Sequence, residues 1–166
     1  MEDSKKYKIL FVCLGNICRS PTAHGMMEHL IDRKGWSDFI EIDSAGTYGG
    51  HQGELPDHRM RAHARRRGLE LTHRSRPVRP SDFESFDLII AMDDRNYSDL
   101  RDMAPDLESE QKIRRMVEYS IHPTYDYIPD PYYSGADGFE LVLDLLEDAC
   151  EGLLNQLSAT NVVPMR

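Results

Sequence analysis

Two uninterrupted runs of apolar residues, at positions 9–12 and 88–92, place the strongest constraint on the fold of this chain. A strand with one wet face alternates apolar and polar residues, whereas a strand of a parallel sheet that is covered on both faces is apolar throughout. After a short loop the first run is followed by Pro21, a residue that the first turn of a helix tolerates well, and apolar residues then recur at helical spacing as far as Gly35. The sequence therefore predicts a buried parallel strand, a loop and an amphipathic helix at its start.

Strand-like and helix-like segments alternate along the rest of the chain, with no internal repeat. With 166 residues, of which 40% are hydrophobic, the chain has the length and composition of one globular domain. The sequence thus predicts a single domain over residues 1–166: an α/β fold with a doubly wound sheet of about four parallel strands and helices on both faces. The expected elements are strands at 9–12, 39–44, 88–92 and 112–117, and helices at 21–35, 56–68, 94–103 and 137–157.

The last of these helices has the clearest pattern. Asp137 and Glu140 have the spacing of a capping box, which predicts that the helix begins there. Apolar residues from Phe139 to Leu157 then fall on one face. Residues 158–166 are predicted to form a frayed tail.

The overall charge argues against a nucleic-acid-binding protein. The chain has 20 Lys and Arg residues against 29 Asp and Glu residues, a formal net charge of −9, whereas nucleic-acid binding relies on a basic face that neutralises phosphates. No apolar run approaches the roughly 18 residues that span a bilayer, and the run after the N-terminal lysines is too short for a signal peptide. We therefore expect a cytoplasmic protein with no nucleic-acid partner and no membrane insertion.

The cysteines and histidines argue against two further classes. Only three cysteines are present, at Cys13, Cys18 and Cys150, too few for a secreted scaffold held by disulfides. The histidines show no ligand spacing with the cysteines. Neither a metal site nor a cofactor is therefore expected.

The segment that joins the first strand to the first helix has the composition of an anion-binding loop. In an open α/β sheet, ligands bind where strand ends meet helix N-termini, and consecutive backbone N–H groups together with the helix dipole favour an anion there. Gly15 permits backbone angles that are closed to other residues, and Asn16 tolerates the left-handed region. The loop is therefore predicted to bind a tetrahedral oxyanion such as inorganic phosphate. Its phosphate-binding members are Leu14, Gly15, Asn16, Ile17, Cys18 and Ser20.

Cys13 and Arg19 give this loop a candidate chemistry. Cys13 is the last residue of the predicted strand and would point into the loop, where the N–H groups and the helix dipole favour its thiolate. Arg19 can return to the rim of the loop and bind two phosphoryl oxygens at once. Ser20 is suited to capping the helix or to donating a hydrogen bond to the thiolate. From the residues alone, a buried core cysteine beside an ordinary turn is the alternative.

Residues 13–21, CLGNICRSP, closely resemble the signature of the low-molecular-weight protein tyrosine phosphatases. The resemblance continues over nearly the whole chain. It includes Asp43-Ser44-Ala45-Gly46, His73, the segment at 92–96 and Asp130-Pro131-Tyr132-Tyr133. The resemblance implies hydrolysis of protein phosphotyrosine through a phosphocysteine intermediate, with no metal and no other cofactor.

The resemblance also implies a role for each catalytic residue. Cys13 would be the nucleophile, Arg19 would bind the phosphate together with the loop amides, and Asp130 would act as general acid and base. Because Asp-Pro is a common turn dipeptide, a plain turn carboxylate is the alternative for Asp130.

Further residues would support this chemistry. Asp93 would support the general-acid loop. A hydrogen-bond network that fixes the phosphate loop would contain Asn16, Ser20, Ser44 and His73, although structural roles are the alternative for Ser44 and His73. The walls of a cleft deep enough to select phosphotyrosine would be Leu14, Ile17, Tyr132 and Tyr133.

Three features have more than one interpretation. Cys18 either forms a protective disulfide with Cys13, as the resemblance implies, or is a small residue packed under the loop. Eight arginines lie between Arg59 and Arg79 with a single acidic residue among them, and they either steer an acidic phosphopeptide or form a solvated surface. At positions 48–51, where the family often places an aromatic wall, Gly50 is expected to leave the cleft open.

Three competing functions fit the residues less well. Arsenate reductases of the same fold use two further cysteines in the middle of the chain, and none lies between Cys18 and Cys150 here. Phosphatases that act on phosphoarginine typically carry Thr at the position of Ile17 and a different aromatic pattern after Asp-Pro. A non-catalytic module that binds phospho-ligands would require neither the Cys13 thiolate nor the Asp130 acid.

Overall fold

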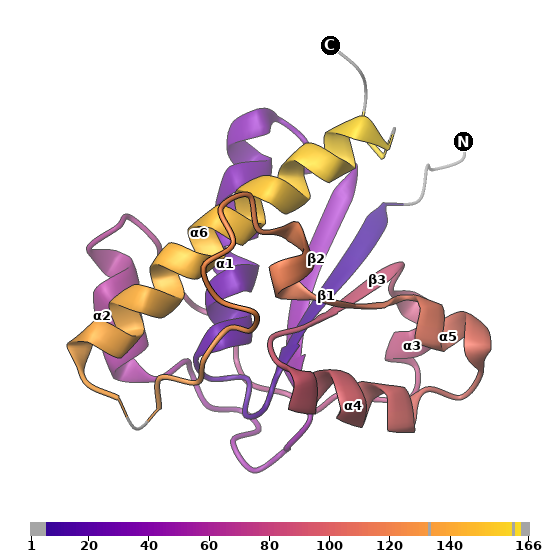
Figure 1. Cartoon of the computed structure of the whole chain (residues 1–166), viewed down its shortest axis with the longest axis horizontal. Coiled ribbons are helices and arrows are strands. Elements are labelled where there is room, and N and C mark those ends of the chain that lie inside the picture. Colours follow the sequence, from indigo (N-terminus) through magenta and orange to yellow (C-terminus); the bar gives the residue numbers. More distant parts are fainter. Residues whose placement is uncertain (1–5, 133, 161, 164–166) are drawn as a thin grey trace.

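A four-stranded parallel sheet with the order β2–β1–β3–β4 forms the centre of the molecule (Figure 1). The structure is a computed structural model and describes residues 6–132, 134–160 and 162–163. The strands are β1 (Tyr7–Cys13), β2 (Ile40–Gly46), β3 (Leu88–Ala91) and β4 (Ile113–Arg115). Because β1 pairs with β2 on one side and with β3 on the other, the strand order reverses at β1, which is where open α/β sheets bind ligands.

Helices cover both faces of the sheet, and alternate residues of β1 point to the two faces. Ile9 and Phe11 pack in a core with α1 (Arg19–Lys34) and α6 (Ala136–Ala159), whereas Leu10 and Val12 pack in a second core with α3 (Asp82–Ser85) and α4 (Asp94–Met103). Figure 1 shows these two helical layers on opposite sides of the strands. The predicted doubly wound α/β fold is therefore confirmed, and both apolar runs are buried for the expected reason.

The remaining elements are short and differ most from the prediction. The helix expected at 56–68 is the shorter α2 (His58–Arg65), and the strand expected at 112–117 turns at its end into the 3₁₀ helix η1 (Met116–Tyr119). Neither α3 nor α5 (Leu107–Gln111) was predicted. Each of these elements is shorter than the window over which helical periodicity becomes visible.

Helix α6 begins in a different way from the predicted one. Its first residue is Ala136, its N-cap is Gly135, and no side chain caps it, so the capping box of Asp137 and Glu140 is wrong. The Glu140 carboxylate instead accepts a hydrogen bond of 2.5 Å from Arg67 Nη2 and lies 2.5 Å from His63 Nδ1. His63 of α2 and Arg67 of the turn after it therefore bind this carboxylate in place of the backbone of α6.

The C-terminal end of α6 also differs from the prediction. The helix continues past Leu157 to Ala159, and Val163 packs in the core beneath α1 and α6. The apolar side chain of Val163 is buried. The frayed tail over residues 158–166 stays a prediction, and residues 161 and 164–166 lie outside the described residues. Neither α6 nor any other helix in the described part of the chain is long and apolar enough to cross a membrane.

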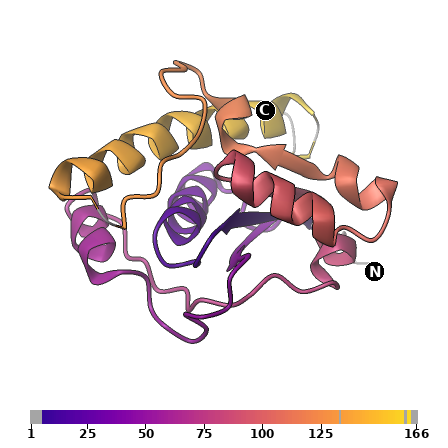
Figure 2. The same ribbon diagram turned by 60° about the horizontal axis from the view of Figure 1, so that its bottom comes forward.

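The loop between β1 and α1 lies at one end of the sheet, where two other connections approach it (Figure 2). The segment after β2 contributes Tyr48 and His51 to the cleft in front of the loop, and the segment that leads into α6 contributes Asp130 and Tyr132. Three connections that are far apart in the sequence therefore meet at the carboxyl end of β1.

Candidate active site

The loop at residues 13–20 is shaped by one left-handed residue and two close packing contacts. Asn16 has a φ of 58°, so the expectation that it adopts the left-handed conformation is confirmed. Gly15 does not adopt it; a Cβ there would lie 2.9 Å from Cδ2 of His51, so the His51 ring would have to shift. On the other side, a Cβ on Gly46 would lie 2.7 Å from the carbonyl oxygen of Leu14. The loop fits between its neighbours because both glycines lack a side chain.

The Cys13 thiol lies at the bottom of this loop, with 2% of the residue exposed. Its Sγ is 3.0 Å from Oγ of Ser20. Ser20 Oγ accepts a hydrogen bond of 2.7 Å from Nδ2 of Asn16, and its one O–H can donate to the sulfur or to the carbonyl oxygen of Ala45, 3.4 Å away. The N-cap of α1 is Cys18, without a side-chain cap. Of the two roles predicted for Ser20, the contact with the thiol is the one present.

Arg19 is buried and held from several directions. Its Nη1 donates to Oδ2 of Asp93 at 2.6 Å and to the carbonyl oxygen of Ile128 at 3.0 Å, and its Nη2 lies 3.7 Å from Oδ2 of Asp130. Burial alone would lower the pKa of the guanidinium, but the Cys13 sulfur and the Asp93 carboxylate outweigh it and raise that pKa above its ordinary value. Arg19 therefore carries a permanent charge between the thiol and two carboxylates.

Asp93 connects this arginine to α4. Its Oδ1 accepts a hydrogen bond of 2.8 Å from the backbone N–H of Asn96 and so caps the helix, while its Oδ2 binds Arg19. Since Arg19 also binds the carbonyl of Ile128, just before Asp130 in the chain, the contact between Asp93 and the predicted general-acid segment runs through Arg19.

The segment that carries Asp130 is anchored from α2. Asp130 Oδ1 accepts a hydrogen bond of 3.0 Å from the N–H of Tyr132, and 41% of the Asp130 side chain is exposed. The carbonyl of Tyr132 accepts a hydrogen bond of 2.9 Å from Nη2 of Arg59, whose guanidinium lies 5.4 Å from the centre of the Tyr132 ring. Arg59 is itself paired with Asp57, the N-cap of α2. Tyr133, the second predicted wall residue on this segment, lies outside the described residues.

A cleft of about 250 Å³ opens onto Cys13 and Asp130. The predicted wall residues that line it are Leu14, Ile17 and Tyr132. Tyr48 and His51 also line it, from the segment at 48–51 where the resemblance places an aromatic wall. The expectation that Gly50 leaves this side open is wrong: a Cβ there would lie 2.2 Å from Cζ of Tyr48, so the glycine makes room for the tyrosine ring.

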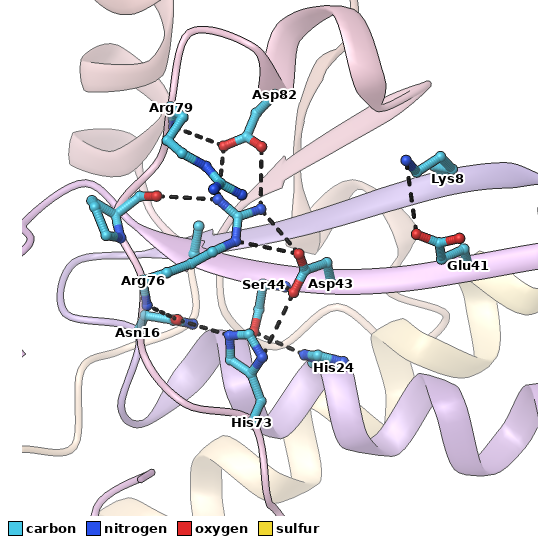
Figure 3. Close-up of polar contacts among 12 residues, drawn as sticks. Lys8, Asn16, His24, Glu41, Asp43, Ser44, His73, Arg76, Arg79 and Asp82 are labelled. Carbon is cyan, nitrogen blue, oxygen red and sulfur yellow. Dashed lines mark hydrogen bonds and ion pairs between the residues drawn. The ribbon is translucent and has the colours of Figure 1, made fainter. Parts of the chain in front are cut away.

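A hydrogen-bond network holds Asn16 from behind the loop (Figure 3). Its Oδ1 accepts hydrogen bonds from Nε2 of His73 at 3.2 Å and from the backbone N–H of Arg76 at 3.1 Å. Ser44, expected in the same network, directs its Oγ to Nδ1 of His24, 2.9 Å away. Burial lowers the pKa of His73, and the neighbouring His24 lowers it further.

Sequence analysis missed several members of this network, His24, Arg76 and Asp82 among them. Arg76 donates to Asp43 at 3.0 Å and to Asp82 at 3.0 Å. Burial alone would lower the pKa of Arg76, but these two carboxylates raise it above its ordinary value. Of the two carboxylates that bind Arg76, only Asp43 lies in a segment that resembles the family, Asp43-Ser44-Ala45-Gly46.

The three cysteines are free thiols in this structure. Cys18 is buried in the core under the loop, and burial raises the pKa of its thiol. Cys150 is fully buried on the core face of α6, where burial likewise raises its pKa. The packing interpretation of Cys18 agrees with this arrangement, and its protective disulfide with Cys13 stays a prediction.

Comparisons with known proteins match nearly the whole chain, including the loop at residues 13–20. Residues 8–163 match the family model described as low molecular weight phosphotyrosine protein phosphatase. A relative from Synechocystis sp. is 46% identical over 150 residues, which cover 90% of this chain and 96% of that protein. The structure of a protein tyrosine phosphatase from Entamoeba histolytica has a TM-score of 0.91 and 45% identity, covering 93% of this chain and 99% of that one. The structure of a Drosophila arginine phosphatase has a TM-score of 0.84 and 33% identity, covering 90% of this chain and 96% of that one.

Proposed function

This chain belongs to the low molecular weight phosphotyrosine protein phosphatase family, and we propose that it hydrolyses protein phosphotyrosine with Cys13 as nucleophile and Asp130 as general acid and base. The observation that carries the proposal is the arrangement around one buried guanidinium. Arg19 lines the same cleft as Cys13, donates to Asp93 and lies 3.7 Å from Asp130. A nucleophile, a cation for the phosphoryl oxygens and an acid for the leaving group are the parts that phosphoryl transfer requires.

In the first step the Cys13 thiolate attacks phosphorus, and the bond between phosphorus and the tyrosine oxygen breaks. The loop amides and Arg19 bind the phosphoryl oxygens, two of which fit the arginine fork. A phenol has a pKa of about 10, so the departing oxygen leaves more readily with a proton, which Asp130 supplies. The products of this step are tyrosine and a phosphocysteine.

In the second step water attacks the phosphocysteine. Asp130 accepts a proton from this water, the phosphorus–sulfur bond breaks, and inorganic phosphate leaves. The O–H of Ser20, whose Oγ lies 3.0 Å from the sulfur, stabilises Cys13 as it becomes a thiolate again.

The lining of the cleft favours phosphotyrosine as the substrate. Cys13 is almost fully buried, and the aromatic side chains of Tyr48 and Tyr132 line the way to it. An aromatic ring held between such groups brings its phosphate to the loop, whereas the stem of phosphoserine is too short. Phosphoarginine is the second candidate, because one of the similar structures is that of an arginine phosphatase.

The test compares hydrolysis of p-nitrophenyl phosphate and of peptides with phosphotyrosine, phosphoserine or phosphoarginine, in EDTA, by wild type, Cys13→Ser and Asp130→Asn. We expect the highest kcat/KM on phosphotyrosine and no turnover by Cys13→Ser. Asp130→Asn is expected to lower kcat on phosphotyrosine by roughly 10²–10⁴, and to lower it less on p-nitrophenyl phosphate, whose leaving group needs no proton.

Each part of the proposal has its own contrary result. A higher kcat/KM on phosphoarginine than on phosphotyrosine would show that phosphoarginine is the preferred substrate. If Asp130→Asn lowered kcat equally on phosphotyrosine and on p-nitrophenyl phosphate, Asp130 would not be the general acid. Phosphate binding without turnover of any substrate would make the protein a binding module. The cytoplasmic location and the absence of a nucleic-acid partner stay predictions, to be tested by cell fractionation and a nucleic-acid binding assay.

A further inference from the structure

A cluster of three metal-ligand side chains lies behind the phosphate loop, outside the cleft (Figure 3). His24 comes from α1, Asp43 from β2 and His73 from the segment after α2, and one ligand atom of each lies within 4.8 Å of the others. The two imidazole rings are neighbours, with centroids 4.8 Å apart. His24 is buried and the other two residues are partly buried.

The hydrogen bonds of His73 leave its Nδ1 as a lone-pair donor toward this cluster. Asn16 Oδ1 accepts the backbone N–H of Arg76, which identifies it as the amide oxygen. Nε2 of His73, 3.2 Å from this oxygen, therefore carries the hydrogen. In the neutral ring Nδ1 is then the unprotonated nitrogen, and it lies 3.6 Å from Oδ1 of Asp43. Burial and His24 lower the pKa of this ring more strongly than Asp43 and a hydrogen bond with the backbone of Ser44, which stabilise the protonated ring, raise it. A proton and a metal ion therefore compete for the space between Nδ1 and Asp43.

His24 has the same arrangement. Its Nε2 lies 3.2 Å from the carboxylate of Glu28, which accepts hydrogen bonds and donates none, so this nitrogen carries the hydrogen. Nδ1 then accepts a hydrogen bond of 2.9 Å from the Ser44 hydroxyl, which a metal ion on Nδ1 would have to displace. An oxygen behind each imidazole, which fixes its tautomer and direction, is the usual support of metal-binding histidines.

Arg76 does not cancel the negative charge of the cluster. Its guanidinium binds Oδ2 of Asp43 at 3.0 Å and also binds Asp82 at 3.0 Å, so two carboxylates share one cation. Oδ1 of Asp43 remains on the side of His73. A divalent cation at this point would therefore meet a surplus of negative charge.

We propose that His24, Asp43 and His73 bind a divalent transition-metal ion such as Zn²⁺, and that this ion inhibits the phosphatase. Two imidazole nitrogens and one carboxylate oxygen, with a fourth position for water, form a donor set that Zn²⁺ accepts at about 2.0–2.2 Å. Ligand atoms up to 4.8 Å apart must approach one another to reach such bonds. His24 is fixed on α1 and Asp43 on β2, whereas His73 lies outside any helix or strand, so we expect His73 to move.

This movement reaches the nucleophile through a short chain of contacts. His73 binds Asn16, Asn16 binds Ser20, and Ser20 lies against the Cys13 sulfur. A shift of His73 therefore changes the support of the thiolate without any ion entering the cleft. The binding site stands on its own residues; the inhibition rests on the proposed phosphatase function.

The first test is calorimetric titration of Zn²⁺ into the full chain carrying Cys13→Ser, which removes the thiolate as a competing ligand. We expect one binding event that His24→Gln weakens by roughly tenfold or more. His29→Gln is the matched control, since His29 is an exposed histidine of the same helix, and it is expected to leave the affinity unchanged. Equal affinity in the two variants, or no binding to the Cys13→Ser protein, overturns the site.

A second measurement does not depend on how well His24→Gln folds. Nitrogen NMR of labelled histidines in the Cys13→Ser protein is expected to show Zn²⁺ shifting Nδ1 of His24 and of His73 while both Nε2 atoms stay protonated. If His73 is instead protonated on both nitrogens and Zn²⁺ changes neither ring, a proton occupies the space beside Asp43 and the proposal fails.

Inhibition is measured separately, on protein that retains Cys13. The inhibition constant of Zn²⁺ is expected to rise roughly tenfold or more in His24→Gln relative to His29→Gln. If His24→Gln loses binding but not inhibition, Zn²⁺ acts at Cys13 and the inhibitory role is overturned. If the wild type has no phosphatase activity, the proposed function fails while the titration still decides the metal site.

Discussion

The nucleophile and the general acid of this site are held in opposite ways. Cys13 is almost fully buried, and the Asn16 and Ser20 side chains that support it are inaccessible to solvent and hydrogen-bonded to one another. Asp130 has 41% of its side chain exposed, although Ile128, two residues earlier, is buried in the core and its N–H binds the carbonyl of Met92 at 2.8 Å. From this anchor onward the segment is held by Arg19 and Arg59. The position of the sulfur is thus part of the folded core, whereas the acid lies at the exposed end of a segment that the core holds at one point.

The comparison leads to different expectations for the two halves. A buried polar group that loses its partner destabilises the fold, so substitutions around Cys13 should reduce stability and activity together. Substitutions around Asp130 should change catalysis and leave stability nearly intact, because exposed positions contribute little to it. Arg19 belongs to both halves, since it reaches Asp93 in the interior and Asp130 at the surface.

Arg19→Lys is expected to have the largest effect. Lysine keeps the charge but lacks the planar fork that binds two phosphoryl oxygens. It also lacks the Nη1 that donates both to Asp93 and to the carbonyl of Ile128. Loss of one preorganised oxyanion donor costs roughly 10²–10³ in kcat, and we expect a fall of this size at saturating phosphotyrosine peptide. Arg65→Lys, at an exposed position of α2, is the control. A kcat within about tenfold of wild type would show that charge alone suffices.

Asn16→Ala is expected to reduce stability and activity together. Alanine disfavours the left-handed backbone at φ 58°, and its side chain leaves the His73 and Arg76 donors without their acceptor. A buried unsatisfied group costs roughly 1–3 kcal/mol, so the free energy of unfolding should fall by about 2–3 kcal/mol in urea.

Asn155→Ala, at an exposed position of α6, is the control for this substitution. If Asn16→Ala lost activity but kept the unfolding free energy of wild type, the buried half would not be coupled to the fold, and the comparison drawn above would fail.

The difference between the buried half around Cys13 and the exposed half around Asp130 also explains which residues the sequence predicts well. The buried strand, the loop and the helix start are consecutive, so the positions of Cys13 and Arg19 follow from local pattern alone. Asp130 was assigned through the resemblance, because an Asp-Pro dipeptide by itself fits a turn equally well.

Residues that act across the fold were harder to predict. His24 on α1, Asp82 on α3 and Tyr48 after β2 all lie around the phosphate loop. The spacing of apolar residues within a helix or strand does not predict contacts between distant segments. The reason for Gly15 was also misjudged, since close packing against His51 leaves no trace in the local sequence. Local conformation was therefore predictable, and partners from distant segments were not.

Arg59→Gln tests the exposed half and is expected to have a moderate effect. Glutamine is shorter than arginine and loses the bond to the Tyr132 carbonyl and the contacts with the Tyr132 and Phe139 rings. We expect KM for a phosphotyrosine peptide to rise roughly fivefold while the urea midpoint stays near that of wild type. Arg65→Gln, on the same helix, is the control. A large loss of stability without a change in KM would place Arg59 among the residues that hold the fold.

Glu140→Gln is expected to have the smallest effect and to depend on pH. Hydrogen bonds from Arg67 and then from His63 lower the pKa of Glu140. Because this pKa is lower in the folded chain than the value of about 4.3 in an unfolded one, the stabilisation is complete above that value and is lost as the pH falls through the folded pKa. At neutral pH the substitution should lower the free energy of unfolding by roughly 0.2–1 kcal/mol, the usual range for an exposed ion pair.

Urea unfolding of Glu140→Gln and wild type between about pH 3 and pH 7 measures this dependence. The difference between them should vanish toward the acid end, and Glu151→Gln, an exposed position of the same helix, should show no such trend. A difference that persists in acid would mean that Glu140 stabilises the chain through contacts that do not need its charge, so that its ion pairs with His63 of α2 and with Arg67 would not account for the effect. Since Arg59 lies on the same helix α2, a difference that vanishes in acid would show that surface charges help to hold the exposed half of the site.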